Sequence, residues 1–231
     1  MRRRLWLVVA APLLAVAALA ATALSPRIDD RPVVSIGAPV ARPFVPDDTV
    51  VEMCGGNTSC LEQALGNIAA RRGPKAAWAE LDRLVAAGIM ASTDCHLATH
   101  KMGSGTMIWS DGSIQTVIAN YRSSCADGYI HGAMDNLLSD LPSDSAAELA
   151  KVVYDTCGEA SEWPNIHEQG NCAHGAGHAL MLHTGYDLPL SLDACEAALN
   201  PSGEDYGGIV WMGCVNGAFM ENYYPSYDVV G

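Results

Sequence analysis

Histidines that recur at helical spacing are the residues of this chain best suited to chemistry. His174 and His178 lie four residues apart in the segment 171–185, and His96 and His100 repeat the same step upstream. On an α-helix this step places both imidazoles on one face, one turn apart. Two such pairs on neighbouring helices are one way to build a metal site inside a helix bundle.

A shorter signature joins a fifth histidine to these pairs. His-Gly-Ala occurs at His131 and at His174, and Asn-Gly-Ala occurs at Asn216, at intervals of 43 and 42 residues. Intervals of about 40 residues are typical of helical-hairpin repeats. We therefore expect helix pairs whose second members pack side by side, with the glycines permitting close approach. The alternative is ordinary helix packing with a coincidental spacing.

The predicted metal ligands are the histidines of these signatures, five of the seven in the chain. They are His96, His100, His131, His174 and His178. Imidazole donors suit a divalent transition metal such as Zn, Fe, Cu or Mn. A mononuclear zinc site uses four ligands, so five histidines are more than one such site needs. The additional histidine could orient a ligand through a hydrogen bond, act as a general base or belong to a dinuclear centre. His167 and His183 fall outside the signatures, and we interpret them as solvated.

Two carboxylates occupy corresponding places in the later signatures. Asp135 lies in Met-Asp-Asn and Glu221 lies in Met-Glu-Asn. Each is a candidate catalytic residue that orients a histidine or acts as a base. The residues that follow the first histidine of each pair are Leu97 and Gly175, so neither pair is His-Glu-x-x-His. A metalloprotease of the usual kind is therefore disfavoured.

The eight cysteines predict a disulfide framework, because the chain has the features of an exported protein. Pairing neighbours in sequence gives Cys54–Cys60, Cys95–Cys125, Cys157–Cys172 and Cys195–Cys214. Cysteines committed to disulfides do not bind metals as thiolates, so histidines and carboxylates remain as ligands.

Residues 1–25 have the pattern of a signal peptide or a signal anchor. Three arginines, 2–4, precede an almost uninterrupted apolar run over residues 5–24. About 20 apolar residues suffice to span a bilayer, so cleavage and retention are both open. Either outcome exports the rest of the chain as a secreted or membrane-anchored protein, and in the second case the membrane is a partner. Residues 26–50 are rich in proline and are expected to form an extended linker.

Charge excludes one class of partner. The chain has 26 acidic and 13 basic residues, a formal net charge of −13, and no lysine or arginine follows Lys151. Such a surface repels nucleic acid. The sequence does not identify a small-molecule or protein partner.

Apolar residues recur at helical spacing through residues 51–231, and no convincing run of alternating β-branched residues occurs. The expected fold is all-α: disulfide-stapled helical-hairpin repeats packed around a central histidine-rich cluster. Glycines over 103–112 and the polar segment 157–171 are expected to interrupt helices. The expected function is that of an exported metal-binding protein, as a metal-dependent hydrolase or oxidoreductase. The alternative is a non-catalytic binding or structural module stabilised by disulfides.

Overall fold

The computed structural model describes residues 44–139, 141, 145–203 and 208–223. Within these ranges the regular structure is helical and no strand occurs, as the sequence predicts. No helix in the described part of the chain is long and apolar enough to cross a membrane. The signal peptide or anchor expected over residues 1–25 lies outside the described residues.

Nine α-helices make up most of the described chain. They are α2 (Thr58–Arg72), α3 (Pro74–Ala86), α4 (Cys95–Trp109), α5 (Ile114–Ala119), α6 (Gly128–Leu138), α7 (Ala146–Val153), α8 (Ile166–His183), α9 (Leu188–Leu199) and α10 (Gly208–Tyr223). Three short helices complete the set: η1 (Val51–Met53), η2 (Tyr154–Gly158) and η3 (Ala160–Glu162).

Local capping sets where several of these helices begin. The side chain of Asn57 accepts a hydrogen bond from the Cys60 amide at the start of α2. Asn165 accepts from two amides at the start of α8. Capping satisfies amides that have no partner inside the helix. α8 therefore begins five residues before the segment 171–185, and the second half of the loop expected over 157–171 is helical.

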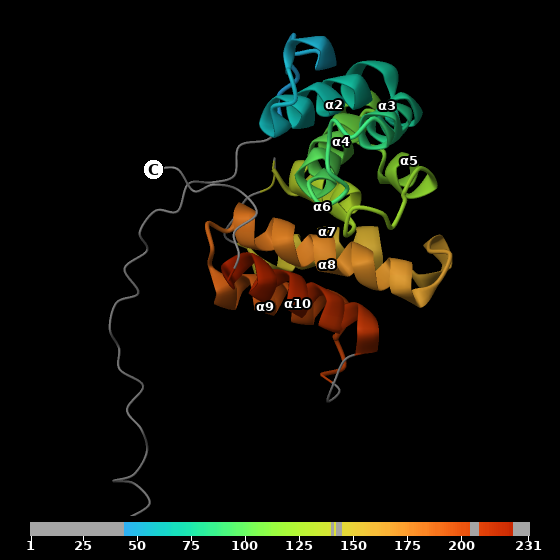
Figure 1. Ribbon diagram of the computed structural model, residues 1–231. Helices are drawn as coiled ribbons and strands as arrows, with labels where there is room; N and C mark the ends of the chain where they lie inside the picture. The colour runs from blue at the N-terminus through green and yellow to red at the C-terminus, as the bar shows by residue number, and fades with distance from the viewer. Residues whose placement is uncertain (1–43, 140, 142–144, 204–207, 224–231) are drawn as a thin grey trace, which may run out of the picture. The chain divides into compact units, whose positions relative to one another are not determined.

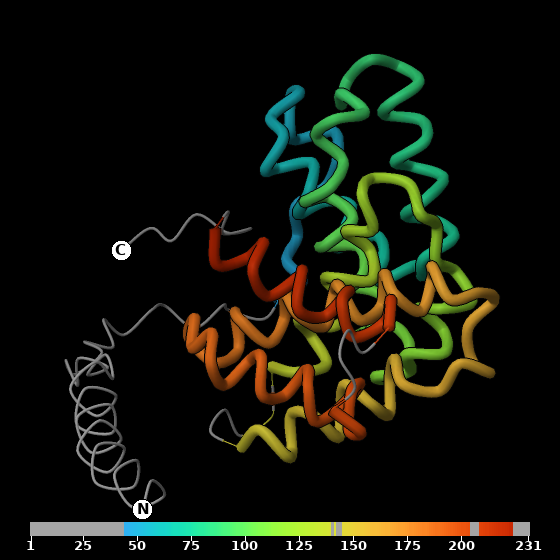
Figure 2. The backbone as a smooth tube through the Cα atoms, turned by 90° about the horizontal axis from the view of Figure 1, so that it is seen from below, coloured from blue at the N-terminus to red at the C-terminus, as the bar shows by residue number. Residues whose placement is uncertain are grey.

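The helices α2, α4, α6, α8 and α10 pack in series, each against the next (Figure 1). Figure 2 shows the red α10 running alongside the orange α8, the most extensive of these contacts. The three members of the Gly-Ala signature consequently lie on three successive helices of the series, α6, α8 and α10.

Glycines bring the backbones of neighbouring helices into direct contact. A Cβ atom at Gly132 of α6 would overlap the His100 carbonyl of α4, and one at Gly103 would overlap the Tyr129 carbonyl in return. Gly177 of α8 and Gly217 of α10 have the same reciprocal relation to Cys214 and His174. The helix break expected over residues 103–112 is therefore wrong up to Trp109. The helix α4 continues to that residue, because its glycines form the contact with neighbouring helices and do not interrupt the helix.

All four predicted disulfides are present, and no cysteine is free. The bridges join residues 54–60, 95–125, 157–172 and 195–214, each between sequence neighbours among the cysteines. Four intramolecular disulfides are typical of a protein in an oxidising, extracytoplasmic environment.

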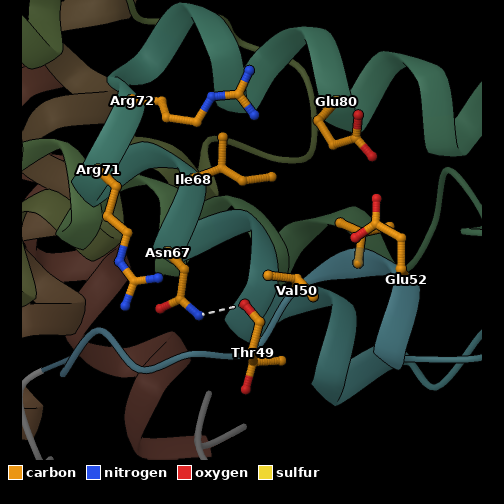
Figure 3. Close-up of a pocket in the computed structure, with 9 residues that line it drawn as sticks. Thr49, Val50, Glu52, Asn67, Ile68, Arg71, Arg72 and Glu80 are labelled. Carbon is orange, nitrogen blue, oxygen red and sulfur yellow. Dashed lines mark hydrogen bonds between the residues drawn. The ribbon is translucent and has the colours of Figure 1, made fainter.

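A cavity of about 210 Å³ lies near the start of the described chain, away from the histidines (Figure 3). It is bounded by residues 49–52, by α2 and by Glu80 of α3. Asn67 fixes one wall by donating a hydrogen bond to the Thr49 carbonyl over 2.8 Å. Phe44, which is buried, also packs against α2 at Gly66. The last residues of the expected linker thus contact the helices.

Replacing Gly132 with alanine is expected to lower the free energy of unfolding by roughly 1–3 kcal/mol, because the methyl group would force α6 away from α4. Chemical denaturation measures the change. Gly170→Ala is the matched control, since a Cβ there meets only ordinary contacts near 3.7 Å in a helix interior. It should be neutral or stabilising by up to about 1 kcal/mol. Equal effects of the two variants would contradict the contact argument.

Candidate metal centre

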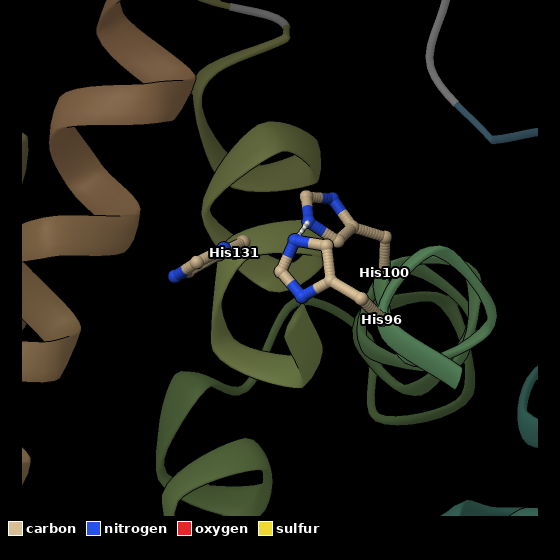
Figure 4. A group of neighbouring side chains, drawn as sticks. All are labelled: His96, His100 and His131. Atoms are coloured by element: carbon tan, nitrogen blue, oxygen red, sulfur yellow. Dashed lines mark hydrogen bonds between the residues drawn. The ribbon is translucent and has the colours of Figure 1, made fainter. Parts of the chain in front are cut away.

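The five predicted histidines lie together, drawn from three successive helices. α4 carries one pair, α6 carries His131, and α8 carries the second pair. Two trios of ligand atoms form, each with its nitrogens within 4.8 Å of one another, and His131 belongs to both. The trios are His96, His100 and His131, and His131, His174 and His178. Figure 4 shows His131 of α6 beside the α4 pair.

Within each pair the two rings meet at their Nε2 atoms. The Nε2 atoms of His96 and His100 are 3.2 Å apart, and those of His174 and His178 are 3.1 Å apart. Two imidazoles bound to one tetrahedral ion at about 2.0–2.1 Å have nitrogens roughly 3.3 Å apart. The spacing in both pairs is therefore that of two ligands on one metal ion.

Acceptors behind the rings determine which nitrogen carries the hydrogen. The Nδ1 of His96 lies 2.9 Å from the Cys125 carbonyl oxygen, and the Nδ1 of His178 lies 2.7 Å from Glu221 Oε2. A carbonyl oxygen and an ionised carboxylate only accept, so each Nδ1 must donate. The neutral ring then presents a lone pair at Nε2. Carboxylate and carbonyl partners of this kind orient histidine ligands in metal sites.

The Nδ1 of His100 faces Asp135 Oδ2 at 3.4 Å, on the side of the ring away from His96. The two predicted carboxylates thus lie behind the rings and not between them. Glu221 is fully buried and also accepts a hydrogen bond from the Tyr186 hydroxyl over 3.1 Å. This geometry matches the orienting role expected for both carboxylates, and their catalytic role stays a prediction.

Burial favours the neutral form of three of the five rings, those of His96, His131 and His174. The pKa of His131 falls well below its ordinary value, first because the ring is desolvated and then because four other histidines surround it. Desolvation likewise lowers the pKa of His96, and it lowers the pKa of His174 to about 4. Neutral imidazole is the form that binds metal ions. Within each pair the Nε2–Nε2 contact is a hydrogen bond between the two rings, and a cation bound between these nitrogens would replace it.

His131 sits between the pairs without a hydrogen bond of its own. Its side chain is 2% exposed, and neither Nδ1 nor Nε2 has a hydrogen-bond partner among the described residues. Its ring centroid lies 5.3–5.4 Å from those of the α4 pair and 4.8–5.3 Å from those of the α8 pair. Buried polar atoms are rarely unpaired, so this ring has the character of a ligand.

The sequence placed one histidine wrongly and missed two outer partners of the cluster. His183, expected to be solvated, is 9% exposed and buried, whereas His167 is exposed as expected. The third signature member, Asn216, is exposed. Tyr186 and the Cys125 carbonyl were missed, because only the folded chain brings them to the rings.

A polar network borders the cluster on the side of the half-buried His96 and His174. Tyr121 donates a hydrogen bond to Asp127, which precedes α6, and Asn171 of α8 donates to the Tyr121 hydroxyl over 3.1 Å. These residues link the start of α6 to α8, one turn before His131 and His174.

No protein-family model, curated protein or solved structure matches the chain. The cluster and the disulfides are compatible with a metal site, and function must be argued from this geometry alone.

The metal-free domain is expected to lose stability as the pH falls from about 6.5 to 4. In that range the unfolded chain protonates its histidines, whereas the lowered pKa values of His131, His96 and His174 oppose their protonation in the fold, so protons favour unfolding. His174 alone contributes on the order of 3 kcal/mol, from a pKa lowered to about 4. Denaturation with a chelator present, repeated at several pH values, measures the slope. The variant His174→Asn should reduce the slope of stability against pH. The variant His167→Asn, at an exposed residue, is the control and should leave the slope unchanged.

Replacing Glu221 with glutamine is expected to weaken metal binding by roughly 10–100-fold, because the His178 ring loses the carboxylate that fixes its orientation. Isothermal titration with zinc or copper measures the affinity. The exposed Asp193→Asn removes a negative charge from α9 without touching a ring and is the control. A similar loss in both variants would mean that net charge, and not ring orientation, governs affinity.

Proposed function

We propose that this protein is an exported transition-metal protein whose ion or ions are bound by the five clustered histidines. One observation carries the proposal above the others. In each pair the two Nε2 atoms lie 3.1–3.2 Å apart, and desolvation lowers the pKa of one ring of each pair, His96 and His174. This separation is the spacing that two imidazole ligands on one metal ion would have.

The donor set favours copper or zinc. All five ligands are imidazoles, and every cysteine is held in a disulfide, so thiolate is not offered. Imidazole nitrogen suits Zn, Cu, Fe and Ni, whereas Ca and Mg require oxygen ligands. The carboxylates Asp135 and Glu221 are engaged with the Nδ1 atoms of His100 and His178, which disfavours the mixed histidine and carboxylate shell typical of non-haem iron.

Among reaction classes we favour a metal-dependent hydrolase or oxidoreductase. Each trio supplies three protein ligands, the number that leaves a fourth position open in catalytic zinc sites. Bound zinc lowers the pKa of a water ligand, and bound copper exchanges electrons. His96 and His174 are half-buried, so each trio has one edge nearer to solvent. Glu221 and Asp135 would hold their rings in place during turnover.

A non-catalytic metal carrier or store is the second candidate. It is favoured by the burial of His100, His131 and His178, which are only 1–2% exposed. A closed shell around the ion would indicate a structural or storage role, and an exchangeable water ligand would indicate catalysis.

Elemental analysis of the disulfide-intact protein, purified after export and again after reconstitution with copper or zinc, tests metal binding. We expect a transition metal to co-purify, and the metal content to fall in His100→Asn and in His178→Asn, each of which removes a buried histidine of the cluster. His167 is exposed and lies on the same helix as His178, so the variant His167→Asn is the control and should retain the metal. A folded wild-type protein that binds neither ion would overturn the proposal.

A further inference from the structure

The ring of His131 is placed differently from the other four. Each of the other rings interacts with a protein group outside the cluster. These groups are the Cys125 carbonyl for His96, Asp135 for His100, the Gly213 backbone for His174 and Glu221 for His178. His131 is buried, with 2% of its surface exposed, and neither of its nitrogens has a hydrogen bond among the described residues. It therefore has two nitrogens to offer, whereas each other ring has one.

The two pairs flank this ring. His131 forms a ligand trio with the α4 pair and another with the α8 pair. Its centroid is within 5.4 Å of all four other rings, which stand on the two helices that pack against α6. In Figure 4 one ring nitrogen of His131 points away from His96 and His100, on the side of α8. The backbone holds the ring there, because Gly132 packs on the His100 carbonyl and Gly175 packs on His131 itself.

A single ion does not account for this arrangement. Both pairs already have the nitrogen spacing of two ligands on one ion, so each pair defines an ion position of its own. Each position lacks a third protein ligand unless His131 supplies it. Since the imidazole ring has its two nitrogens on different edges, one ring can supply both positions.

The geometry points to a dinuclear centre in which His131 bridges two metal ions as an imidazolate. One ion is bound by His96, His100 and one nitrogen of His131. The other is bound by His174, His178 and the second nitrogen. The ions would be about 6 Å apart across the ring, from metal–nitrogen bonds of roughly 2 Å on each side. This inference rests on the proposed function, because it assigns how the same histidines divide the metal.

Bridging has a defined proton balance. A neutral imidazole has one lone pair and one N–H, so it binds the first ion without losing a proton. Binding of the second ion at the other nitrogen displaces the N–H proton to solvent, and the ring becomes an anion shared by two cations. That negative charge offsets part of the repulsion between the ions in a buried site. No redox step is involved, and Asp135 and Glu221 keep their bonds to the outer nitrogens.

Copper(II) titration followed by electron paramagnetic resonance tests the bridge on the full, disulfide-intact protein. About two equivalents should bind, and the signal should grow with the first and fall with the second, because unpaired electrons on two imidazolate-bridged ions couple antiferromagnetically. Loading about one equivalent of copper and one of zinc should restore an uncoupled copper signal from the molecules that hold one ion of each kind. Two bound copper ions with additive, uncoupled signals would overturn the bridge while leaving metal binding intact.

Ligand variants provide a second readout. The double variant His96→Asn with His100→Asn should retain about one equivalent, and so should His174→Asn with His178→Asn, each with an uncoupled copper signal. His131→Gln removes the bridge and should abolish coupling whether or not copper is retained at the pairs. A wild-type stoichiometry of about one equivalent would overturn the bridge, and no binding at all would overturn the proposed function as well. His167→Asn is the control, with wild-type stoichiometry and coupling expected.

Discussion

Direct contact between helix backbones is the constraint on which the rest of this structure depends. Gly132 and Gly103 bring α6 against α4, and Gly177 and Gly217 bring α10 against α8. Two of the carbonyls in these contacts belong to His100 and His174, so the packing surface and the histidine-bearing turns are the same residues. With ordinary side chains at Gly103 and Gly132, α4 and α6 would stand farther apart, and so would the histidines that they carry.

The same contacts explain why so polar a cluster is tolerated inside a helical domain. Desolvating five imidazoles costs free energy, and burial alone would favour rings that are hydrogen-bonded on both sides. Instead, acceptors such as the Cys125 carbonyl and Glu221 satisfy only the outer nitrogens. The inner Nε2 atoms of each pair face each other at 3.1–3.2 Å, the separation that two ligands on one metal ion would have.

The sequence predicted the helical class, the four disulfides and the five clustered histidines, because each depends on local spacing or on pairing of neighbours. It did not predict that α4 continues through Gly103, since a glycine that breaks a helix and one that packs a helix look alike in a single chain. It also missed Tyr186 and the Cys125 carbonyl as outer partners. Their proximity to the rings depends on the three-dimensional path of the chain, and a carbonyl has no sequence signal.

The disulfide between Cys95 and Cys125 has a consequence for the order of assembly. Cys95 directly precedes His96, and Cys125 supplies the carbonyl that fixes the His96 ring, so this covalent bond joins the histidine to its own orienting group. A chain that still has reduced thiols lacks this restraint. The orientation of the His96 ring is therefore fixed only after this bond has formed.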